Sequence, residues 1–331
     1  MRRVLSHPAW KRIGIAMLLV SAGSIPAFAS DIQLFRLTAV LVYAIALLGL
    51  NILTGYNGQI SLGHGAFYTL GAYVAAGLAA FFAIPHWMAL PIAAAVCLAA
   101  GCLFALPLVR LPHIQFALVT FALAMATPTL ANYKAIERWT GGSQGLGLDK
   151  PEVPFGLPLS YDQWIYLLAL AVLTVSFVAA SNLLRGRIGR AAVAIRDHPL
   201  AAQVAGIDTA LYKTLIFGIS AMYAGTAGAL SGMALLYVSP AGIFVSLGFL
   251  IGSAVGGIAS LSGAIYGAVF LQFILLVTGG IAHSAKISAV LAIYGIVVIA
   301  FLHLLPAGVA GGIAKLAAWA RRQLGRLEGT T

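Results

Sequence analysis

The sequence predicts an all-α membrane protein, a polytopic transmembrane helical bundle of about ten spans that forms one membrane-embedded domain over residues 1–331. Of the 331 residues, 61% are hydrophobic and only 8% are charged, whereas about 25% of the residues of a soluble domain are charged. The mean hydropathy is +1.00. Apolar runs long enough to cross a hydrocarbon core, about 20 residues each, recur along the chain, and such unbroken runs are not typical of a β-barrel.

The expected spans are, in chain order, 13–30, 37–54, 61–83, 88–109, 113–131, 162–184, 214–236, 245–260, 263–281 and 287–305. Two of them, 113–131 and 245–260, are short and could be broken or re-entrant. Residues 1–30 have an alternative interpretation, because a basic start, an apolar centre and the ending Ala27-Phe28-Ala29 also fit a secretory signal peptide. We favour an uncleaved first span over a cleaved signal.

The distribution of Lys and Arg predicts the orientation, because cytoplasmic loops are enriched in these residues. With the N-terminus in the cytoplasm, 14 of the 19 Lys and Arg fall on the cytoplasmic side, many of them in the loop at 185–213 and in the basic tail at 306–331. The five on the outer side are balanced by five acidic residues, so the net charge of +11 lies inside. This charge is explained by topology and by contact with anionic membrane lipid, and it requires no nucleic acid.

The chain lacks the residues on which several transport mechanisms depend. All eight Asp and Glu lie in loops, at span ends or in the tail, so no carboxylate relay of an ion-coupled transporter is present. No Gly-Lys dipeptide occurs, which excludes the phosphate-binding loop G-x-x-x-x-G-K-[ST]. We therefore expect a non-catalytic transport subunit without a cofactor or metal. A passive channel remains open, and active transport would need energy from another subunit.

Residues 50–77, LNILTGYNGQISLGHGAFYTLGAYVAAG, are not an ordinary span, because six glycines alternate with polar side chains at membrane depth. The polar residues are Asn51, Tyr56, Asn57, Gln59, Ser61 and His64. An unpaired polar group in hydrocarbon costs a few kcal/mol, so these groups must pair internally or line a wet cavity. One interpretation is a translocation path with a broken helix. The other is close glycine-mediated packing with internal hydrogen bonds, which the spacing alone favours, for His64 in particular.

Residues 189–207, GRAAVAIRDHPLAAQVAGI, are too polar to cross a bilayer and too apolar for a solvated loop; we call them the elbow. We expect one short helix up to Arg196, a break before Pro199 and a second short helix that stops at Gly206. The apolar side of the second helix is mostly Ala, without Trp or Phe, which favours docking against protein over a helix lying on lipid. The residues expected to make or permit this contact are Gly189, Arg190, Arg196, Ala201, Ala202 and Gly206. For Arg190 and Arg196, acids on a protein partner and lipid phosphates are equally suitable partners.

Together these stretches resemble the permease subunit of the branched-chain amino-acid ABC importers, the LivM type. The similar segments are 49–76, the outer-loop segment TGGSQGLGL at 140–148, the elbow, and 237–268, and the resemblance covers about residues 30–306. One departure is Leu200, where the broader coupling motif of importers often has an acidic residue.

The resemblance implies an ABC importer permease architecture in a bacterial inner membrane, with the elbow as the segment that engages the ATPases. It also implies the partners: a second, LivH-type permease, two ATPase subunits and an extracytoplasmic substrate-binding protein. The implied substrate is a branched-chain or other small hydrophobic amino acid, and relatives also carry urea, amides or aromatic acids. We expect the outer loop, 132–161, to dock the binding protein through Lys134, Arg138 and Lys150, the alternative being a solvated loop.

Overall fold

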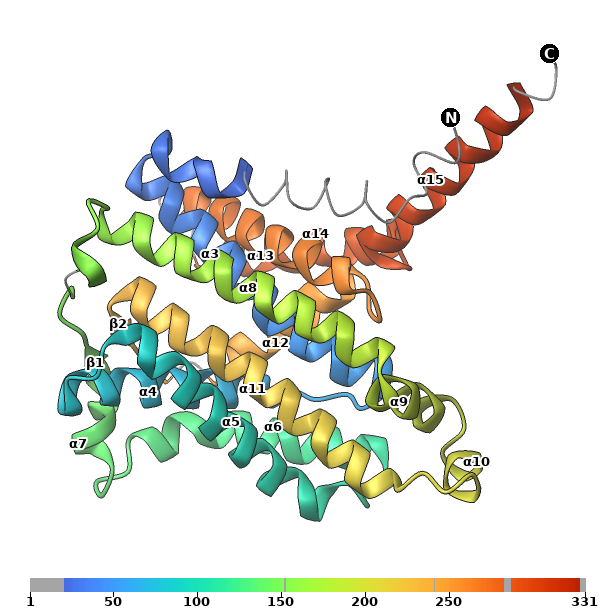
Figure 1. The fold of residues 1–331 in the computed structure, drawn as a ribbon, viewed down its shortest axis with the longest axis horizontal. Coiled ribbons are helices and arrows are strands. Elements are labelled where there is room, and N and C mark those ends of the chain that lie inside the picture. The colour runs from blue at the N-terminus through green and yellow to red at the C-terminus, as the bar shows by residue number, and fades with distance from the viewer. Residues whose placement is uncertain (1–20, 152, 241, 283–286, 328–331) are drawn as a thin grey trace.

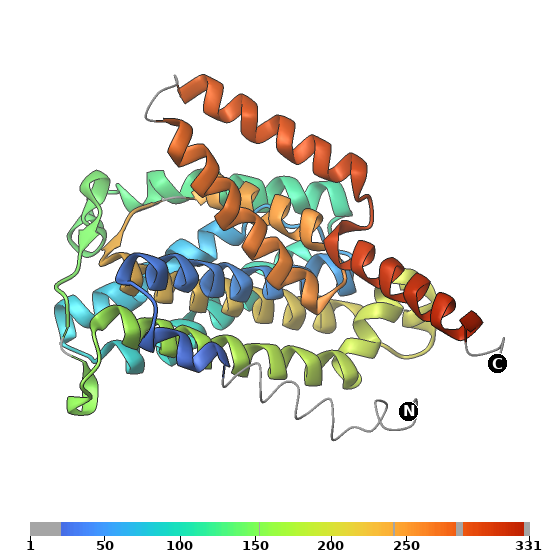
Figure 2. The same cartoon turned by 90° about the horizontal axis from the view of Figure 1, so that it is seen from above.

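The computed structural model describes residues 21–151, 153–240, 242–282 and 287–327, which are almost entirely helical, so the all-α class is confirmed. The long helices run roughly alongside one another in an elongated bundle (Figures 1 and 2). Within these ranges, six segments are long and apolar enough to cross a membrane. They are α3 with the turn that follows it (Asp31–Tyr56), α4 (His64–Phe82), α5 (His86–Leu108), α6 (His113–Ala131), α8 (Tyr161–Arg185) and α11 (Thr209–Leu235).

The remaining helices follow the expected order of spans. They are α12 (Gly242–Gly256), α13 (Leu261–Ala282), α14 (Ile287–Leu304) and α15 (Gly308–Leu327). Every expected span after the first therefore coincides with a helix, whereas the span at 13–30 lies mostly outside the described residues. The 15 residues of α12 rise only about 22 Å, less than the ~30 Å hydrocarbon core, so this helix alone is shorter than a full span.

Helix α11 lies at the centre of the bundle and packs against α3, α4 and α5. Its glycines permit this, because a Cβ on Gly228 would overlap the backbone of Tyr68 in α4, and a Cβ on Gly71 of α4 would overlap the backbone of Gly225. Small residues at helix crossings are typical of membrane bundles, where packing replaces the hydrophobic driving force. The core is therefore built around α11 by close backbone contact.

The outer loop, 132–161, lies at one end of the bundle and the elbow at the other (Figure 1). The loop contains α7 (Glu137–Thr140) and the strand β1 (Leu146–Gly147), which pairs antiparallel with β2 (Tyr237–Val238) after α11. Gly141, Gly142 and Gly145 all have positive φ, which explains three of the four glycines of TGGSQGLGL. The elbow consists of α9 (Arg187–Asp197) and α10 (Pro199–Val204), and α15 leaves the bundle at this same end.

Candidate functional site: a broken helix and an elbow

The chain breaks between α3 and α4 within residues 51–64, which we call the break. Helix α3 (Asp31–Leu50) continues into a π-helical turn, Asn51–Tyr56, and the backbone then leaves the helix at Gly58, whose φ is +72°. The amide of Gln59 reaches back to the carbonyl of Leu53 at 3.3 Å, and α4 begins only at His64. Because π-helical turns are frequent at functional sites, this break is the first candidate region.

His64 joins three helices through one hydroxyl. Its Nε2 lies 2.6 Å from Oγ of Ser220 in α11, and that hydroxyl donates to the carbonyl of Gly49 in α3 at 2.6 Å. The hydroxyl proton is thus committed to Gly49, so Nε2 carries a proton and donates it to Ser220. The other ring nitrogen, Nδ1, lies 3.3 Å from Ser61 Oγ and accepts from it. Both nitrogens of this buried histidine therefore have partners inside the chain.

Asn51 ties the break to the turn between α12 and α13. Its Oδ1 accepts from Ser253 Oγ at 2.5 Å, and its Nδ2 donates to the carbonyl of Ser260 at 3.0 Å. Asn57 Nδ2 donates to Gln59 Oε1 at 2.8 Å, while Asn57 Oδ1 has no hydrogen-bond partner among the described residues.

The structure thus brings the sequence-predicted residues together in one region. Asn51, Gln59, Ser61 and His64 are at most 4% exposed, and Tyr56 is half-buried. These contacts are the ones that the packing interpretation requires. The translocation-path interpretation stays a prediction for transport measurements.

The elbow has the predicted form. Helix α9 ends at Asp197, His198 forms the break, and α10 starts at Pro199. Gly206 has a φ of +84°, as a left-handed helix stop requires. Asp208 then caps α11 by accepting from the amide of Leu211 at 3.0 Å. Gly189 lies so close to Leu184 of α8 that a Cβ would overlap its backbone, so α9 folds tightly back on α8.

The burial pattern of α10 corrects one part of the sequence interpretation. Ala202 is only 4% exposed, because it faces the interior of the elbow, whereas Leu200 is 76% and Val204 91% exposed. Ala202 therefore does not lie on the exposed surface of α10, contrary to the sequence interpretation. The exposed apolar residues of α10 are Leu200, Ala201 and Val204, which we call the elbow tip.

Both arginines of the elbow bind backbone carbonyls of this chain. Arg190 Nη1 donates to the carbonyl of Arg185 at 2.9 Å. Arg196 Nη1 donates to the carbonyl of Gly55 in the break at 2.7 Å, and its Nε pairs with Asp197 Oδ1 at 2.9 Å. Neither contact was expected from the sequence. The contact between Arg196 and Gly55 joins residues that are 141 positions apart.

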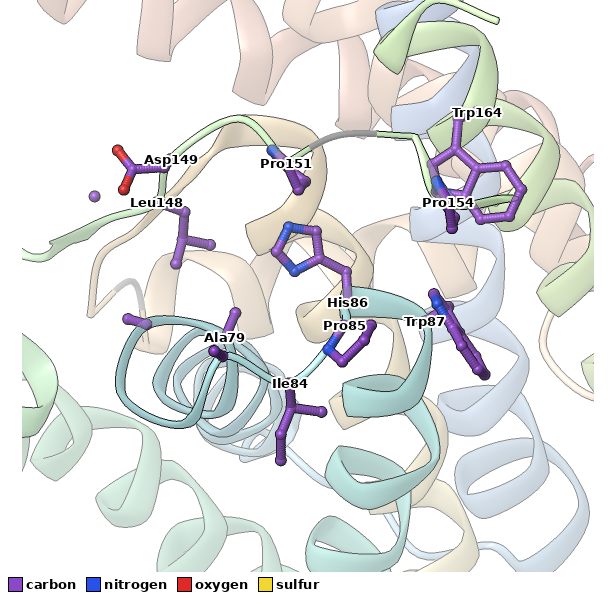
Figure 3. A pocket seen from close by; sticks show the side chains of 13 residues that line it. Ala79, Ile84, Pro85, His86, Trp87, Leu148, Asp149, Pro151, Pro154 and Trp164 are labelled. Atoms are coloured by element: carbon purple, nitrogen blue, oxygen red, sulfur yellow. The ribbon is translucent and has the colours of Figure 1, made fainter. Parts of the chain in front are cut away.

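At the opposite end of the bundle lie exposed cationic side chains and a cavity. Lys134 and Arg138 are exposed, and the ammonium of Lys150 lies 5.4 Å from the ring centroid of Tyr161. Between the α4–α5 corner and residues 147–149, with Pro151 and Pro154, lies a cavity of about 370 Å³. The His86 ring points into it (Figure 3), and neither ring nitrogen has a hydrogen-bond partner among the described residues. In the same residues, no three His, Cys, Asp or Glu side chains cluster closely enough to hold a metal.

The family described as "Branched-chain amino acid transport system / permease component" matches residues 33–313. This chain belongs to that family. Two curated relatives are the "High-affinity branched-chain amino acid transport system permease protein LivM" of Salmonella typhimurium and of Escherichia coli. Each is 30% identical over 288 residues, which cover 79% of this chain and 67% of the relative. No solved structure gives a significant match.

The family match includes both the break and the elbow of this permease, and it confirms the resemblance seen in the sequence motifs. Two features of the permease could not be found from those motifs. The partner of His64 is Ser220, which lies 156 residues away in an otherwise ordinary span. The partner of Arg196 is a backbone carbonyl, which carries no residue-type signal at all.

Proposed function

We propose that this permease is the transmembrane subunit of an ATP-driven importer for branched-chain or other small hydrophobic amino acids. The observation that carries the proposal is the elbow tip, where Leu200 and Val204 are exposed at the end of a two-helix segment between two long spans. An exposed apolar surface of this kind marks a protein contact. Family membership supports an ATPase as that partner, and the names of the two relatives support the substrate class.

The proposed assembly contains this chain, a LivH-type permease, two ATPase subunits and an extracytoplasmic binding protein. The elbow and both termini lie in the cytoplasm of a bacterial cell, and the outer loop faces outward. Lys134, Arg138 and Lys150 steer the binding protein to this loop, next to the cavity that contains His86. The chain supplies the path, and separate subunits hydrolyse ATP. The elbow transmits their motion to α8 and α11, to which it is directly joined.

Reconstitution in liposomes tests the assignment. We expect uptake of labelled leucine only when both permeases, the ATPases, loaded binding protein and ATP are present. The purified single chain should neither conduct nor follow an imposed ion gradient. Gradient-driven uptake by the single chain would overturn the importer assignment. Competition with isoleucine, valine, urea, acetamide and phenylalanine then decides among the substrates that the sequence resemblance leaves open.

A charge on the elbow tip tests the ATPase contact. Val204→Asp places a carboxylate at a site that docking must desolvate, so the ATPases should dissociate while the permease pair still forms and binds its delivery protein. Ala210→Asp is the matched control, because it adds the same charge just beyond the elbow, in the first turn of α11, where an acid is favourable. Co-purification of the ATPases with Val204→Asp at the level of the control would refute elbow docking.

A further inference from the structure

One arginine of the elbow forms a hydrogen bond with the break. Arg196 is the penultimate residue of α9, and its guanidinium donates to the carbonyl of Gly55 at 2.7 Å. Its aliphatic stem lies against Gly58, where a Cβ would come within 2.8 Å of Arg196 Cγ. The same guanidinium is held from its other side by Asp197 at 2.9 Å. The side chain therefore bridges the elbow and the break, with 35% of its surface exposed.

The carbonyl of Gly55 is a site where a cation is expected to be held. It lies one residue before the end of the π-helical turn, and the last carbonyls of a helix have no partner within the helix. They also carry the negative end of the helix dipole, which favours a cation within the last turn. Arginine is always charged and offers several donors in a rigid fork, so it can bind Gly55 and Asp197 together.

Two glycines of the break, Gly55 and Gly58, make this contact possible. Without a side chain at Gly58, the stem of Arg196 can lie on the backbone. At Gly55, a Cβ would overlap the backbone of Ala259 in the turn between α12 and α13. Asn51 binds the same turn through Ser260. The π-helical turn is therefore enclosed between the elbow and the α12–α13 turn, and a displacement of either one must move it.

The elbow is stiff enough to transmit such a displacement. Ala191, Ala192 and Ile195 of α9 are all at most 6% exposed, so α9 is anchored along one face. Arg196 lies on this anchored helix, directly before the junction that leads to the elbow tip. A force applied at the tip is thus delivered at the residue that holds Gly55.

We propose that Arg196 is a positioning residue that couples the elbow to the break. Its guanidinium caps the end of the π-helical turn, and movement of the elbow carries the Gly55 carbonyl with it. The segment after this turn, with Asn57 and Gln59, is thereby reoriented. This inference rests on the proposed importer function, because the movement of the elbow is supplied by the ATPases.

The test uses the full complex with Arg196→Gln, Arg196→Lys and the matched control Arg187→Gln. Arg187 is an exposed arginine of the same helix, at the opposite end of α9 from Arg196. In Arg196→Gln we expect the ATPases to stay bound and to hydrolyse ATP, while substrate transported per ATP falls at least about tenfold, the effect of losing one charged hydrogen bond. Arg196→Lys, which keeps the charge but not the fork, should be intermediate. Arg187→Gln should be close to wild type.

A second measurement detects movement of the break directly. Ile60 is 48% exposed, so a thiol at Ile60→Cys, with Cys97 and Cys102 replaced by Ala, can be labelled. Its labelling rate should change when a non-hydrolysable ATP analogue binds, and this change should disappear in Arg196→Gln.

The outcomes separate the two proposals. Unchanged transport per ATP in Arg196→Gln, or a preserved labelling response, overturns the coupling role of Arg196. If the ATPases dissociate from Arg196→Gln, this residue belongs to the docking contact. That result also overturns its coupling role, while the importer assignment stands. Absence of ATP-driven uptake in the wild-type complex overturns the importer assignment itself.

Discussion

Replacement of Ser220 by Ala should destabilise this permease by about 2 kcal/mol, because one hydroxyl joins three helices. Ser220 of α11 accepts from His64 Nε2 in α4 and donates to the Gly49 carbonyl in α3, both at 2.6 Å. Hydrogen bonds between membrane helices contribute about 0.6 kcal/mol each on average and up to about 1.7. Ala removes two of them and leaves the Nε2–H of a histidine that is 1% exposed without an acceptor, a further cost of about 1 kcal/mol.

A double-mutant cycle isolates the hydrogen bond from the change in packing. His64→Leu removes the imidazole at similar volume, so the double variant with Ser220→Ala leaves no orphaned donor and should be little less stable than Ser220→Ala alone. We expect a coupling energy of about 1 kcal/mol, measured by thermal or SDS unfolding of the permease pair in detergent. Additive costs, or a Ser220→Ala variant as stable as wild type, would refute the reasoning. Lost transport with unchanged stability and assembly would favour the translocation-path interpretation of His64.

Three further outcomes follow from the same structure. Gly228→Ala should lower the stability of the pair by about 1–3 kcal/mol in thermal melting, because its Cβ would overlap the Tyr68 carbonyl of α4; Gly248→Ala, which faces open space, should not. Cysteines at the exposed Ser143 and Lys315 should react with an impermeant maleimide from opposite sides of the membrane, and reaction of both from outside would contradict the topology. Lys134→Glu should slow the ATPase stimulation by loaded binding protein and weaken its dependence on salt, and an unchanged salt dependence would leave the loop without a docking role.

The fold could be predicted because its signals are local. A span is recognised from its own hydropathy, and the elbow helices are bounded by Pro199 and Gly206, whose backbone preferences do not depend on the rest of the chain. The π-helical turn could not be predicted, since NILTGY is compatible with an ordinary α-helix. Nor could the orientation of α10. Its apolar residues share one side, but a six-residue helix does not reveal which side faces the protein, and Ala202 was therefore misplaced.

The side-chain partners across the bundle could not be predicted from local sequence, for a different reason. Ser220 is one of several serines in apolar spans, and only the crossing of α4 with α11 selects it as the partner of His64. The contact between Arg196 and Gly55 depends on the close approach that Gly58 permits and on the fold of the break. Sequence identifies which polar groups need partners at membrane depth, and the three-dimensional packing decides which partners they find.

The placement of these contacts decides which part of the permease can move. At the elbow end, the Arg196 side chain binds Gly55, Gly55 lies against Ala259, and Gly257 of the same turn lies against Gly308 at the base of α15. Helix α11 also contacts α9 and the π-helical turn, and it is held on three sides by α3, α4 and α5. Closely packed helices of this kind resist deformation, whereas turns at the ends of helices absorb changes in backbone angle. A displaced elbow therefore moves the break, the α12–α13 turn and the attached end of α11 against the closely packed core. For this reason a label at Ile60, in the break, is a better reporter of coupling than one in the packed part of α11.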